Sequence, residues 1–460
     1  MPATTTRILV VGLGASGEAA ARHCLSAEDL AAEVTVIDAD DTQSLRLRAD
    51  GLRALGAKVE LGVEDVDGAF DLAVMSPGVP PAAPIFAAAR RVATEIVSEI
   101  EFAYRRSAAP WIAVTGTNGK TTVTSLIGHL LVGAGVPARV VGNIGPPAIA
   151  AVAETGSAGV FVAEVSSFQL ALTDTFHPRV AVLLNITPDH LDWHGDMTTY
   201  ASDKAKVFAR LDADDTAVID VDDAGAAAHV GPVSSRGVRV VRVSHTHVPE
   251  GGAGVDSDGT LVAPGASGPV RLVHRDELAI KGSHNLGNAC AAAAAALAFG
   301  VGPDAIRVGL RTFQPLEHRL EPVGIVAGVE YYNDSKATNP GAAIKALGAF
   351  EDARVVALLG GRNKGFSFDE LAHVVKERAV EPVVFGEAAL EIGEALSRVG
   401  VAYREASGLA DAVHIASTLA EPGTAIVLSP ACASFDEFAS YAERGRAFKR
   451  VVDSYAKEGS

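Results

Sequence analysis

One short stretch, residues 116–122, combines two glycines, a lysine and three threonine hydroxyls. It lies between the apolar run 111–114, which is suited to a buried strand, and residues 123–131, where apolar side chains recur at helical spacing. A turn between a strand and a helix directs backbone N–H groups towards an anion. Lys120 would then reach the outer phosphates of a nucleotide, and the Thr121 hydroxyl is placed to bind the accompanying Mg²⁺.

The stretch matches the phosphate-loop consensus G-x-x-x-x-G-K-[ST] incompletely, because Val114 stands where the consensus has its first glycine. The motif alone leaves an ordinary glycine-rich turn as an alternative. The lysine and the following threonine are nevertheless in register, so the stretch is the predicted ATP-binding loop. Its members are Gly116, Thr117, Asn118, Gly119, Lys120, Thr121 and Thr122.

Two further polar side chains follow apolar strands. The run 160–163 ends on Glu164, and the run 180–186 leads within a few residues to His190. If both strands lie in one sheet, Glu164 and His190 reach the same edge, and with Thr121 they make a plausible Mg²⁺ site. Each residue alone would more often be a surface or capping residue, and the nearby phosphate loop reverses that preference. A helix predicted over residues 200–208 carries Lys204.

Near the N-terminus, residues 12–17 read GLGASG, a complete G-x-G-x-x-G after a strand, and Asp38 ends the next strand. This is the fingerprint of a dinucleotide-binding, Rossmann-like unit, and it raises an NAD-dependent dehydrogenase as an alternative. The same tight turn and helix N-terminus serve any diphosphate, so the motif indicates a diphosphate more firmly than NAD. A further turn containing Ser76 should line the same crevice.

Residues beyond about 316 alternate between apolar strands and helical patterns, which predicts a second doubly wound sheet. Lys364 and Ser434 follow strands there, at the edge where open parallel sheets bind ligands. In the middle of the chain, the turn at residues 142–145 carries Asn143 as its one polar side chain, which either serves a ligand or bonds its own backbone.

At 460 residues the chain is longer than one core usually serves. We therefore predict an α/β protein of three domains. Residues 1–107 form a Rossmann-like domain, residues 108–316 a central P-loop-type ATPase domain with a parallel sheet, and residues 317–460 a C-terminal Rossmann-like domain.

Composition restricts the partners. The net charge of −17 argues against a nucleic-acid-binding surface. The three cysteines are too few and too scattered for a disulfide framework or a metal knuckle, so a reducing compartment fits. The first residues resemble a strand rather than a signal peptide, and the longest alanine-rich run is too short to cross a bilayer. We expect a soluble, cytoplasmic protein, most simply a monomer.

Several motifs, in order along the chain, resemble those of the Mur ligases. They are residues 116–121 (GTNGKT), 164–170 (EVSSFQL), 185–192 (NITPDHLD), 284–285 (HN), 318–319 (HR), 333–339 (NDSKATN) and 429–434 (SPACAS). The resemblance implies an ATP-dependent amide ligase of peptidoglycan precursor synthesis. It would join D-glutamate to UDP-N-acetylmuramoyl-L-alanine through an acyl phosphate, with Mg²⁺.

The resemblance also implies roles for individual residues. Lys120, Glu164, His190 and Lys204 would be catalytic, with Lys204 carbamylated, and Thr121, Glu164, His190 and Lys204 would bind metal. ATP would also contact Asn285, Asn288, Arg319, Asp334 and Lys336. The UDP-sugar substrate would contact Gly14, Ala15, Ser16, Gly17, Asp38, Ser76, Asn143, Ser166 and His190, and D-glutamate would contact Thr338, Lys364, Ser434 and Tyr441.

Three other interpretations stay open. Another Mur-type ligase would use a different amino acid. A dehydrogenase would leave Lys120, Glu164 and His190 without a role. A non-enzymatic, nucleotide-gated binding module would bind ATP without turnover, and the ligand-like turns after residue 316 make it less attractive.

Overall fold

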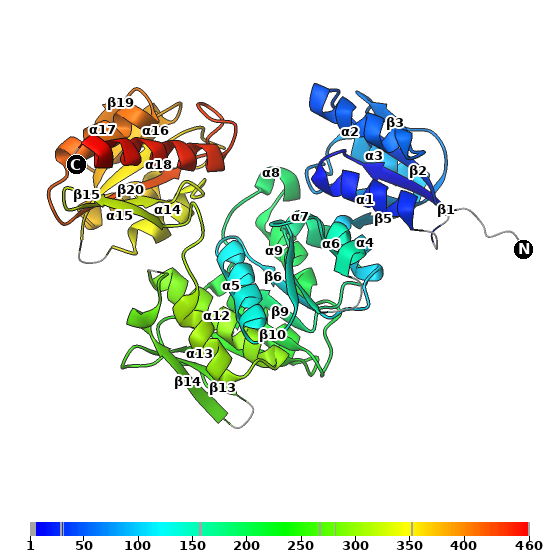
Figure 1. Cartoon of the computed structure of the whole chain (residues 1–460), viewed down its shortest axis with the longest axis horizontal. Helices are drawn as coiled ribbons and strands as arrows, with labels where there is room; N and C mark the ends of the chain where they lie inside the picture. The colour runs from blue at the N-terminus through cyan, green and yellow to red at the C-terminus, as the bar shows by residue number, and fades with distance from the viewer. Residues whose placement is uncertain are drawn as a thin grey trace, which may run out of the picture. The chain divides into compact units, whose positions relative to one another are not determined.

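The computed structural model describes residues 6–27, 30, 32–155, 159–265, 268–280, 282–350 and 353–458 (Figure 1). The chain forms two compact units. The first contains Met1–Glu277 and Gly287–Arg311, and the second contains Leu278–Leu286 and Thr312–Ser460.

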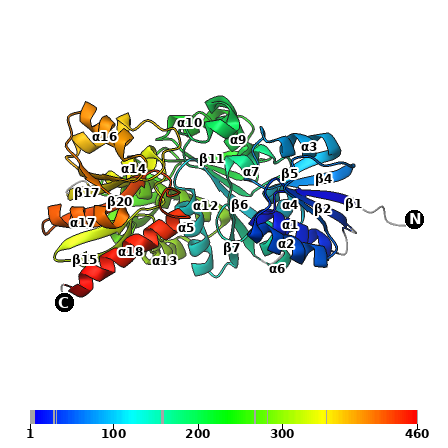
Figure 2. The ribbon, with the colours of Figure 1, turned by 90° about the horizontal axis from the view of Figure 1, so that it is seen from above.

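A five-stranded parallel sheet of order β3-β2-β1-β4-β5 opens the first unit. Its strands are β1 (Thr6–Val11), β2 (Ala32–Asp38), β3 (Lys58–Leu61), β4 (Phe70–Met75) and β5 (Ala93–Ser98). Its helices are α1 (Ala15–Ser26), α2 (Gln43–Ala54), α3 (Pro84–Val92) and α4 (Glu99–Arg105). Figure 2 shows α3 on one side of this sheet and α1 and α2 on the other. The predicted Rossmann-like arrangement is confirmed.

The sequence of β1 explains this layering. Ile8 and Val10 belong to one buried cluster, whereas Leu9 and Val11 belong to another. A strand with helices on both faces must be apolar at successive positions. The run of apolar residues in β1 therefore predicts a covered parallel strand.

A second parallel sheet in the same unit has the order β11-β10-β9-β6-β8-β7. Its strands are β6 (Trp111–Thr115), β7 (Ala138–Gly142), β8 (Val160–Glu164), β9 (Val180–Leu183), β10 (Thr216–Asp220) and β11 (Arg239–Val243). Strand β6 lies between β8 and β9, so the strands that lead to Glu164 and His190 flank the strand that leads to the phosphate loop.

Helices and short antiparallel strands complete the first unit. The helices before residue 235 are α5 (Lys120–Gly133), α6 (Ala148–Thr155), α7 (Ser167–Ala171), α8 (Leu191–His194), α9 (Met197–Ala205), α10 (Ala224–Ala227) and α11 (Val230–Ser234). Strands β12 (Gly254–Val255), β13 (Thr260–Gly265) and β14 (Gly268–His274) form a small sheet. Helices α12 (Ser283–Phe299) and α13 (Pro303–Thr312) follow, and most of their residues belong to the first unit.

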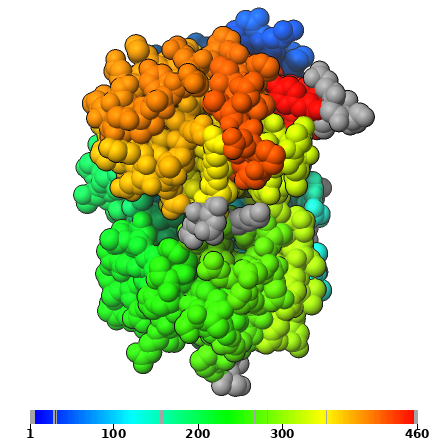
Figure 3. Space-filling model, turned by 90° about the vertical axis from the view of Figure 1, so that its left-hand side faces the viewer, coloured from blue at the N-terminus to red at the C-terminus, as the bar shows by residue number. Residues whose placement is uncertain are grey.

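The second unit is built on a sheet of order β15-β16-β20-β17-β18-β19, in which only the β15 and β16 pair is antiparallel among the described strands. The strands are β15 (Glu321–Val326), β16 (Val329–Asn333), β17 (Arg354–Gly360), β18 (Glu381–Phe385), β19 (Arg404–Ala406) and β20 (Thr424–Ala431). The helices are α14 (Pro340–Leu347), α15 (Asp369–Glu377), α16 (Ala389–Arg398), α17 (Leu409–Leu419) and α18 (Tyr441–Glu458). The orange segment that includes α16 lies on its surface (Figure 3), where Leu390 is 71% exposed.

The three large sheets fall within the three segments predicted from the sequence. The predicted boundaries after residues 107 and 316 stay predictions. In the described part of the chain, no helix combines the length and the apolar character that a membrane span requires.

Candidate active site

The phosphate loop joins the end of β6 to the start of α5. Gly116 has φ +149° and Gly119 has φ +86°. A Cβ at Gly116 would lie 3.0 Å from Leu184 Cβ, and one at Gly119 would lie 2.6 Å from Asn288 Oδ1. Both positions combine a positive φ with close neighbours, so glycine is required at each. The same contact brings Asn288, a predicted nucleotide contact, beside the loop.

Asn185, two residues after the end of β9, binds the phosphate loop through hydrogen bonds. Asn118 N–H donates to Asn185 Oδ1 at 2.7 Å, and Asn185 Nδ2 donates back to the Asn118 carbonyl at 3.0 Å. Thr117 N–H donates to the Asn185 carbonyl at 2.9 Å. Asn185 was not among the predicted site residues, although its position shortly after a buried strand is a usable signal.

Lys120 is the first residue of α5. Its Nζ donates to the carbonyls of Gly116 and Thr117, each at 2.9 Å. The ammonium group therefore lies over the loop itself, on the side where a helix N-terminus favours an anion. Thr122, two residues after Lys120 in the same helix, is buried.

Glu164 ends β8 and is 2% exposed. Thr121 Oγ1 donates to Glu164 Oε2 at 2.8 Å, and Asn143 Nδ2 donates to Glu164 Oε1 at 2.7 Å. Three residues predicted separately, from a loop, a turn and a strand end, thus meet at one carboxylate. The Asn143 side chain bonds this carboxylate and not its own backbone, which was the alternative considered from the sequence.

Lys204 lies in α9 and is 2% exposed. Its Nζ donates to the Gly116 carbonyl at 2.9 Å and lies 4.5 Å from the centre of the Tyr200 ring. Burial, reinforced by the nearby charge of Lys120, holds the pKa of the Lys204 ammonium well below its ordinary value. Removal from water disfavours the charged ammonium form relative to the neutral amine.

His190 follows β9 with φ +52°. Its Nε2 lies 3.5 Å from Asp189 Oδ2, and its ring packs on Phe168 with centroids 4.8 Å apart. Strands β8 and β9 both pair in parallel with β6, so Glu164 and His190 follow strand ends at the same edge of the sheet. The metal ligation predicted for His190 stays a prediction. Ser166 caps α7 by accepting the Gln169 N–H at 3.3 Å.

A buried trio near this edge was not predicted. His194 Nδ1 lies 2.9 Å from Asp203 Oδ2, and His194 Nε2 lies 2.9 Å from Ser167 Oγ. These contacts join α7, α8 and α9 and so fix the helix that carries Lys204. No regular pattern in the sequence pairs residues from three short helices.

After β1 of the first sheet, α1 begins at Ala15 with the exposed Gly14 as its N-cap. Asp38 Oδ2 accepts the Leu13 N–H at 2.6 Å, and Ser76 Oγ donates to the Gly12 carbonyl at 2.8 Å. The predicted diphosphate turn is therefore tied to the two neighbouring strands. Ser16 and Gly17 follow in the first turn of the helix, at its N-terminal end.

In the second unit, Asp334 follows β16 and is buried. It accepts the Ser429 hydroxyl at 2.8 Å and the Leu320 N–H at 3.2 Å. Burial raises the pKa of the Asp334 carboxyl to about 7. Arg319, another predicted residue, is close enough for its charge to oppose that rise.

The predicted amino-acid contacts lie on the loops of the same sheet. Lys336 Nζ lies 5.1 Å from the centre of the Tyr441 ring, and Thr338 N–H donates to the Lys336 carbonyl at 2.9 Å. Lys364 is exposed after β17. Ser434 is 2% exposed, and its hydroxyl has no hydrogen-bond partner among the described residues.

One buried arginine organises these loops and was not predicted. Arg444 in α18 is 1% exposed. Its Nε donates to Ser335 Oγ at 3.0 Å, and its Nη2 donates to the carbonyls of Ser335 and Cys432 at 2.9 and 3.0 Å. Its Nη1 donates to the carbonyls of Gly360 and Ala433 at 3.4 and 3.2 Å. All five guanidinium donors are used, across the loops that follow β16, β17 and β20.

Comparison with known proteins agrees with this arrangement. Residues 114–296 match the Mur ligase middle domain, and residues 318–432 match the Mur ligase, glutamate ligase domain. The chain is 44% identical to the UDP-N-acetylmuramoylalanine–D-glutamate ligase of Pelotomaculum thermopropionicum, over 99% of both chains. It is 42% identical to the enzyme of the same name from Frankia casuarinae, over 98% of this chain and 94% of that one. This chain belongs to the Mur ligase family.

Solved structures show the same fold. A UDP-N-acetylmuramate-alanine ligase from Thermotoga maritima superposes with a TM-score of 0.60 at 20% identity, over 98% of this chain and 100% of that chain. MurF from Acinetobacter baumannii gives 0.61 at 18% identity, over 96% and 93% of the two chains. The three-domain α/β architecture predicted from the sequence is confirmed at the level of the Mur ligase fold. The dehydrogenase alternative is excluded by membership in this family.

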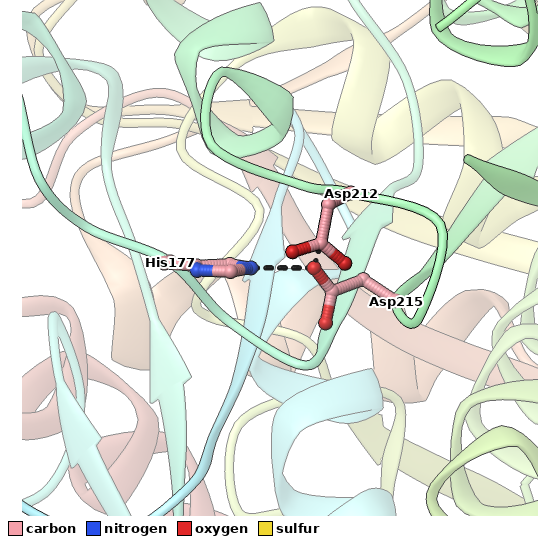
Figure 4. Close-up of side chains that lie close together, drawn as sticks. All are labelled: His177, Asp212 and Asp215. Atoms are coloured by element: carbon pink, nitrogen blue, oxygen red, sulfur yellow. Dashed lines mark hydrogen bonds and ion pairs between the residues drawn. The ribbon is translucent and has the colours of Figure 1, made fainter. Parts of the chain in front are cut away.

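This Mur ligase also contains a polar cluster outside the phosphate loop, formed by His177, Asp212 and Asp215 (Figure 4). His177 Nε2 lies 2.5 Å from Asp215 Oδ2, which also accepts the Asp212 N–H at 2.9 Å. Arg179 Nη1 lies 3.4 Å from Asp215 Oδ1. Since the buried carboxylate already faces a cation, we interpret the cluster as an ion pair that fixes the segment before β9.

Proposed function

We propose that this chain joins D-glutamate to UDP-N-acetylmuramoyl-L-alanine with hydrolysis of ATP to ADP and phosphate, through an acyl-phosphate intermediate. The observation that carries this proposal is the meeting of Thr121, Asn143 and Glu164 beside the phosphate loop. Relatives named as D-glutamate ligases match the chain over nearly its whole length, which supports the choice of amino acid.

The chemistry explains why such a loop is needed. A carboxylate is a poor electrophile until one of its oxygens becomes part of a phosphate leaving group. The substrate carboxylate oxygen attacks the γ-phosphorus of ATP and ADP leaves. The amine of D-glutamate then attacks the acyl carbon, and inorganic phosphate departs as the amide forms. Charge spreads over the phosphoryl oxygens during the first step, so donors placed in advance stabilise its transition state.

The chain supplies those donors from the loop between β6 and α5. Lys120 would move from the carbonyls of Gly116 and Thr117 to the phosphate oxygens, and backbone N–H groups at the start of α5 would bind the same anion. Asn288, beside Gly119, would contact the nucleotide base from α12. Asn285, Arg319, Asp334 and Lys336 are the other proposed ATP contacts.

Thr121, Glu164, His190 and Lys204 would hold Mg²⁺. The hydroxyl and carboxylate oxygens of Thr121 and Glu164 are the hard ligands that this ion prefers, and they lie within hydrogen-bonding distance of each other. Mg²⁺ would supply charge neutralisation at the transferred phosphoryl group. The lowered pKa of the Lys204 ammonium eases loss of its proton, and the neutral amine is the form that reacts with CO₂, which supports its proposed conversion to a carbamate.

The remaining site residues are proposed to position the two substrates. The diphosphate of the UDP-sugar would bind the turn at Gly14, Ala15, Ser16 and Gly17, with Asp38 and Ser76 holding that turn and Asn143, Ser166 and His190 lying along the sugar. D-glutamate would bind Thr338, Lys364, Ser434 and Tyr441. The buried Ser434 hydroxyl is a suitable donor to a carboxylate, since no described group accepts from it.

We also propose that the protein is a cytoplasmic monomer that binds small molecules. It is proposed to bind neither nucleic acid nor a membrane. The net charge of −17 supports the first of these exclusions, because phosphate backbones are bound by clustered cations.

A phosphate-release assay tests the proposal. The purified chain is incubated with ATP, Mg²⁺ and UDP-N-acetylmuramoyl-L-alanine, and one amino acid is varied. We expect release with D-glutamate and none above background with L-glutamate, L-lysine, L-alanine or meso-diaminopimelate. Release with one of the others, but not with D-glutamate, would assign the chain to a different Mur ligase reaction.

A further inference from the structure

Glu99 is a buried carboxylate that none of the proposed substrate contacts explains. It is the first residue of α4 and is 1% exposed. Its Oε1 accepts the Ile149 N–H at 2.7 Å, and the Ala148 N–H also contacts the carboxylate. These are the first two N–H groups of α6, so Glu99 caps a helix 50 residues further along the chain.

The helix that Glu99 caps is preceded by the turn of Asn143. Residues 142–147 connect β7 to α6, and the Gly142 N–H donates to the Pro146 carbonyl at 3.2 Å. Helix α4 also lies close to the other end of this turn, because a Cβ on Gly142 would lie 3.3 Å from Ile100 Cδ1. The first turn of α4 therefore holds both ends of the segment that carries Asn143.

The same turn is joined directly to Glu164. Asn143 N–H donates to the Glu164 carbonyl at 2.9 Å, in addition to the side-chain bond to Oε1. A continuous set of contacts thus runs from Glu99 through the start of α6 and the Asn143 turn to the carboxylate that Thr121 contacts. The hydrogen bonds among these contacts go to backbone groups or to a buried carboxylate, which leaves little freedom for the Asn143 turn to shift alone.

We propose that Glu99 is a positioning residue for the Mg²⁺ site: by capping α6 it fixes the Asn143 turn, which in turn orients the Glu164 carboxylate. The inference rests on the proposed function, because it assumes that Glu164 binds the metal. Groups that orient a metal ligand commonly change metal affinity about 10- to 100-fold when they are removed.

Glu101 provides a matched comparison on the same helix. It is also buried, and it accepts the N–H groups of Asp174, Thr175 and Phe176 at 3.1, 2.9 and 3.0 Å. That segment leads to β9 and does not include Asn143. Loss of Glu101 should therefore weaken the fold without changing the orientation of Glu164.

The test compares Glu99→Ala, Glu99→Gln and Glu101→Gln with the wild type. Binding of Mn²⁺ in the presence of ADP is titrated by electron paramagnetic resonance, and the Mg²⁺ concentration for half-maximal phosphate release is measured in parallel. We expect Glu99→Ala to weaken Mn²⁺ binding at least fivefold and to raise the Mg²⁺ requirement by a similar factor. Glu99→Gln keeps a carbonyl oxygen for the Ile149 N–H and should stay within twofold of the wild type.

The control Glu101→Gln should lower the melting temperature but leave Mn²⁺ binding within twofold. If Glu99→Ala also lowers only the melting temperature, the positioning role is overturned. Should Glu99→Ala fail to fold, Glu99→Asp withdraws the carboxylate by one methylene, and unchanged Mn²⁺ binding in that variant would equally overturn it. A wild type that is inactive with D-glutamate yet binds Mn²⁺ would contradict the proposed function rather than this inference.

Discussion

Thr121 donates a hydrogen bond of 2.8 Å from its hydroxyl to Oε2 of Glu164. The bond joins the first turn of α5 to the end of β8, two elements separated by 43 residues in the chain. It places the hydroxyl that follows the phosphate-loop lysine directly against a buried carboxylate. This pair is the smallest unit of the proposed metal site, because each residue alone has a plausible structural role.

Replacing Thr121 by Val tests this pair with little change in volume. The substitution removes the hydroxyl from both Glu164 and the proposed metal, so kcat should fall about 10- to 100-fold. Phosphate release at saturating substrates measures the effect. Thr124→Val is the control, because Thr124 is buried one turn further along α5 and its hydroxyl donates to the Lys120 carbonyl rather than to Glu164. A loss of kcat as large for Thr124→Val as for Thr121→Val would point to helix packing instead.

Lys120→Ala separates nucleotide chemistry from binding of the UDP-sugar. The lysine lies on the phosphate loop, and the proposed diphosphate turn lies on a different sheet of the first unit. We expect phosphate release to fall by at least about 10³-fold, since a positioned cation is lost from the charged transition state. Calorimetric binding of UDP-N-acetylmuramoyl-L-alanine should stay within about threefold of the wild-type affinity by the same reasoning. Loss of both would indicate misfolding.

The parts of this site that could be predicted from the sequence are those marked by residues close together in the chain. Glycines with a lysine in register mark a strand-to-helix turn, and apolar runs mark covered parallel strands, so Lys120 and Glu164 could be singled out. The contacts that fix them are long-range. Asn185, Arg444 and Glu99 bind backbone groups that are distant in the chain, and His194 joins side chains from two other helices. Only the folded topology brings these groups together. A motif read along the chain contains no signal for such pairs.

Arg444 illustrates the part that was missed, and Arg444→Lys measures its contribution. Lysine has three donors where arginine has five, and its shorter head cannot reach three loops at once. At least two of the five buried acceptors would lose their hydrogen bond to this side chain, which should cost about 2–4 kcal/mol of unfolding free energy. The KM for D-glutamate should rise, because the same loops carry Thr338, Lys364 and Ser434, which are proposed to bind D-glutamate. Differential scanning calorimetry and the phosphate-release assay check the two effects.

The control is Arg446→Lys, two residues further along α18, where the side chain is exposed. Exposed substitutions of this kind usually change stability by less than about 0.5 kcal/mol. Equal destabilisation by both variants would contradict the role assigned to Arg444.

The pH dependence of stability tests the environment of Glu99 independently of activity. Burial raises the pKa of the Glu99 carboxyl from 4.5 to about 7. Between these values the folded chain retains a proton that the unfolded chain has released. The stabilising contribution of the protonated acid is therefore complete below about pH 4.5 and is lost as the pH rises to about 7. A shift of this size corresponds to about 3 kcal/mol of unfolding free energy.

Glu99→Gln removes the titration and keeps the shape of the side chain. The difference in unfolding free energy between wild type and Glu99→Gln should fall by up to about 3 kcal/mol from pH 4.5 to 7 and stay constant above that. Both tryptophans, Trp111 and Trp193, lie in the first unit, so their fluorescence during denaturant unfolding reports on the unit that contains Glu99. Asp334, whose pKa is also raised, is present in both proteins, and its contribution cancels in the difference. Parallel stability curves for the two proteins across this range would mean that Glu99 is ionised in the fold throughout it, and the raised pKa of this carboxyl would be wrong.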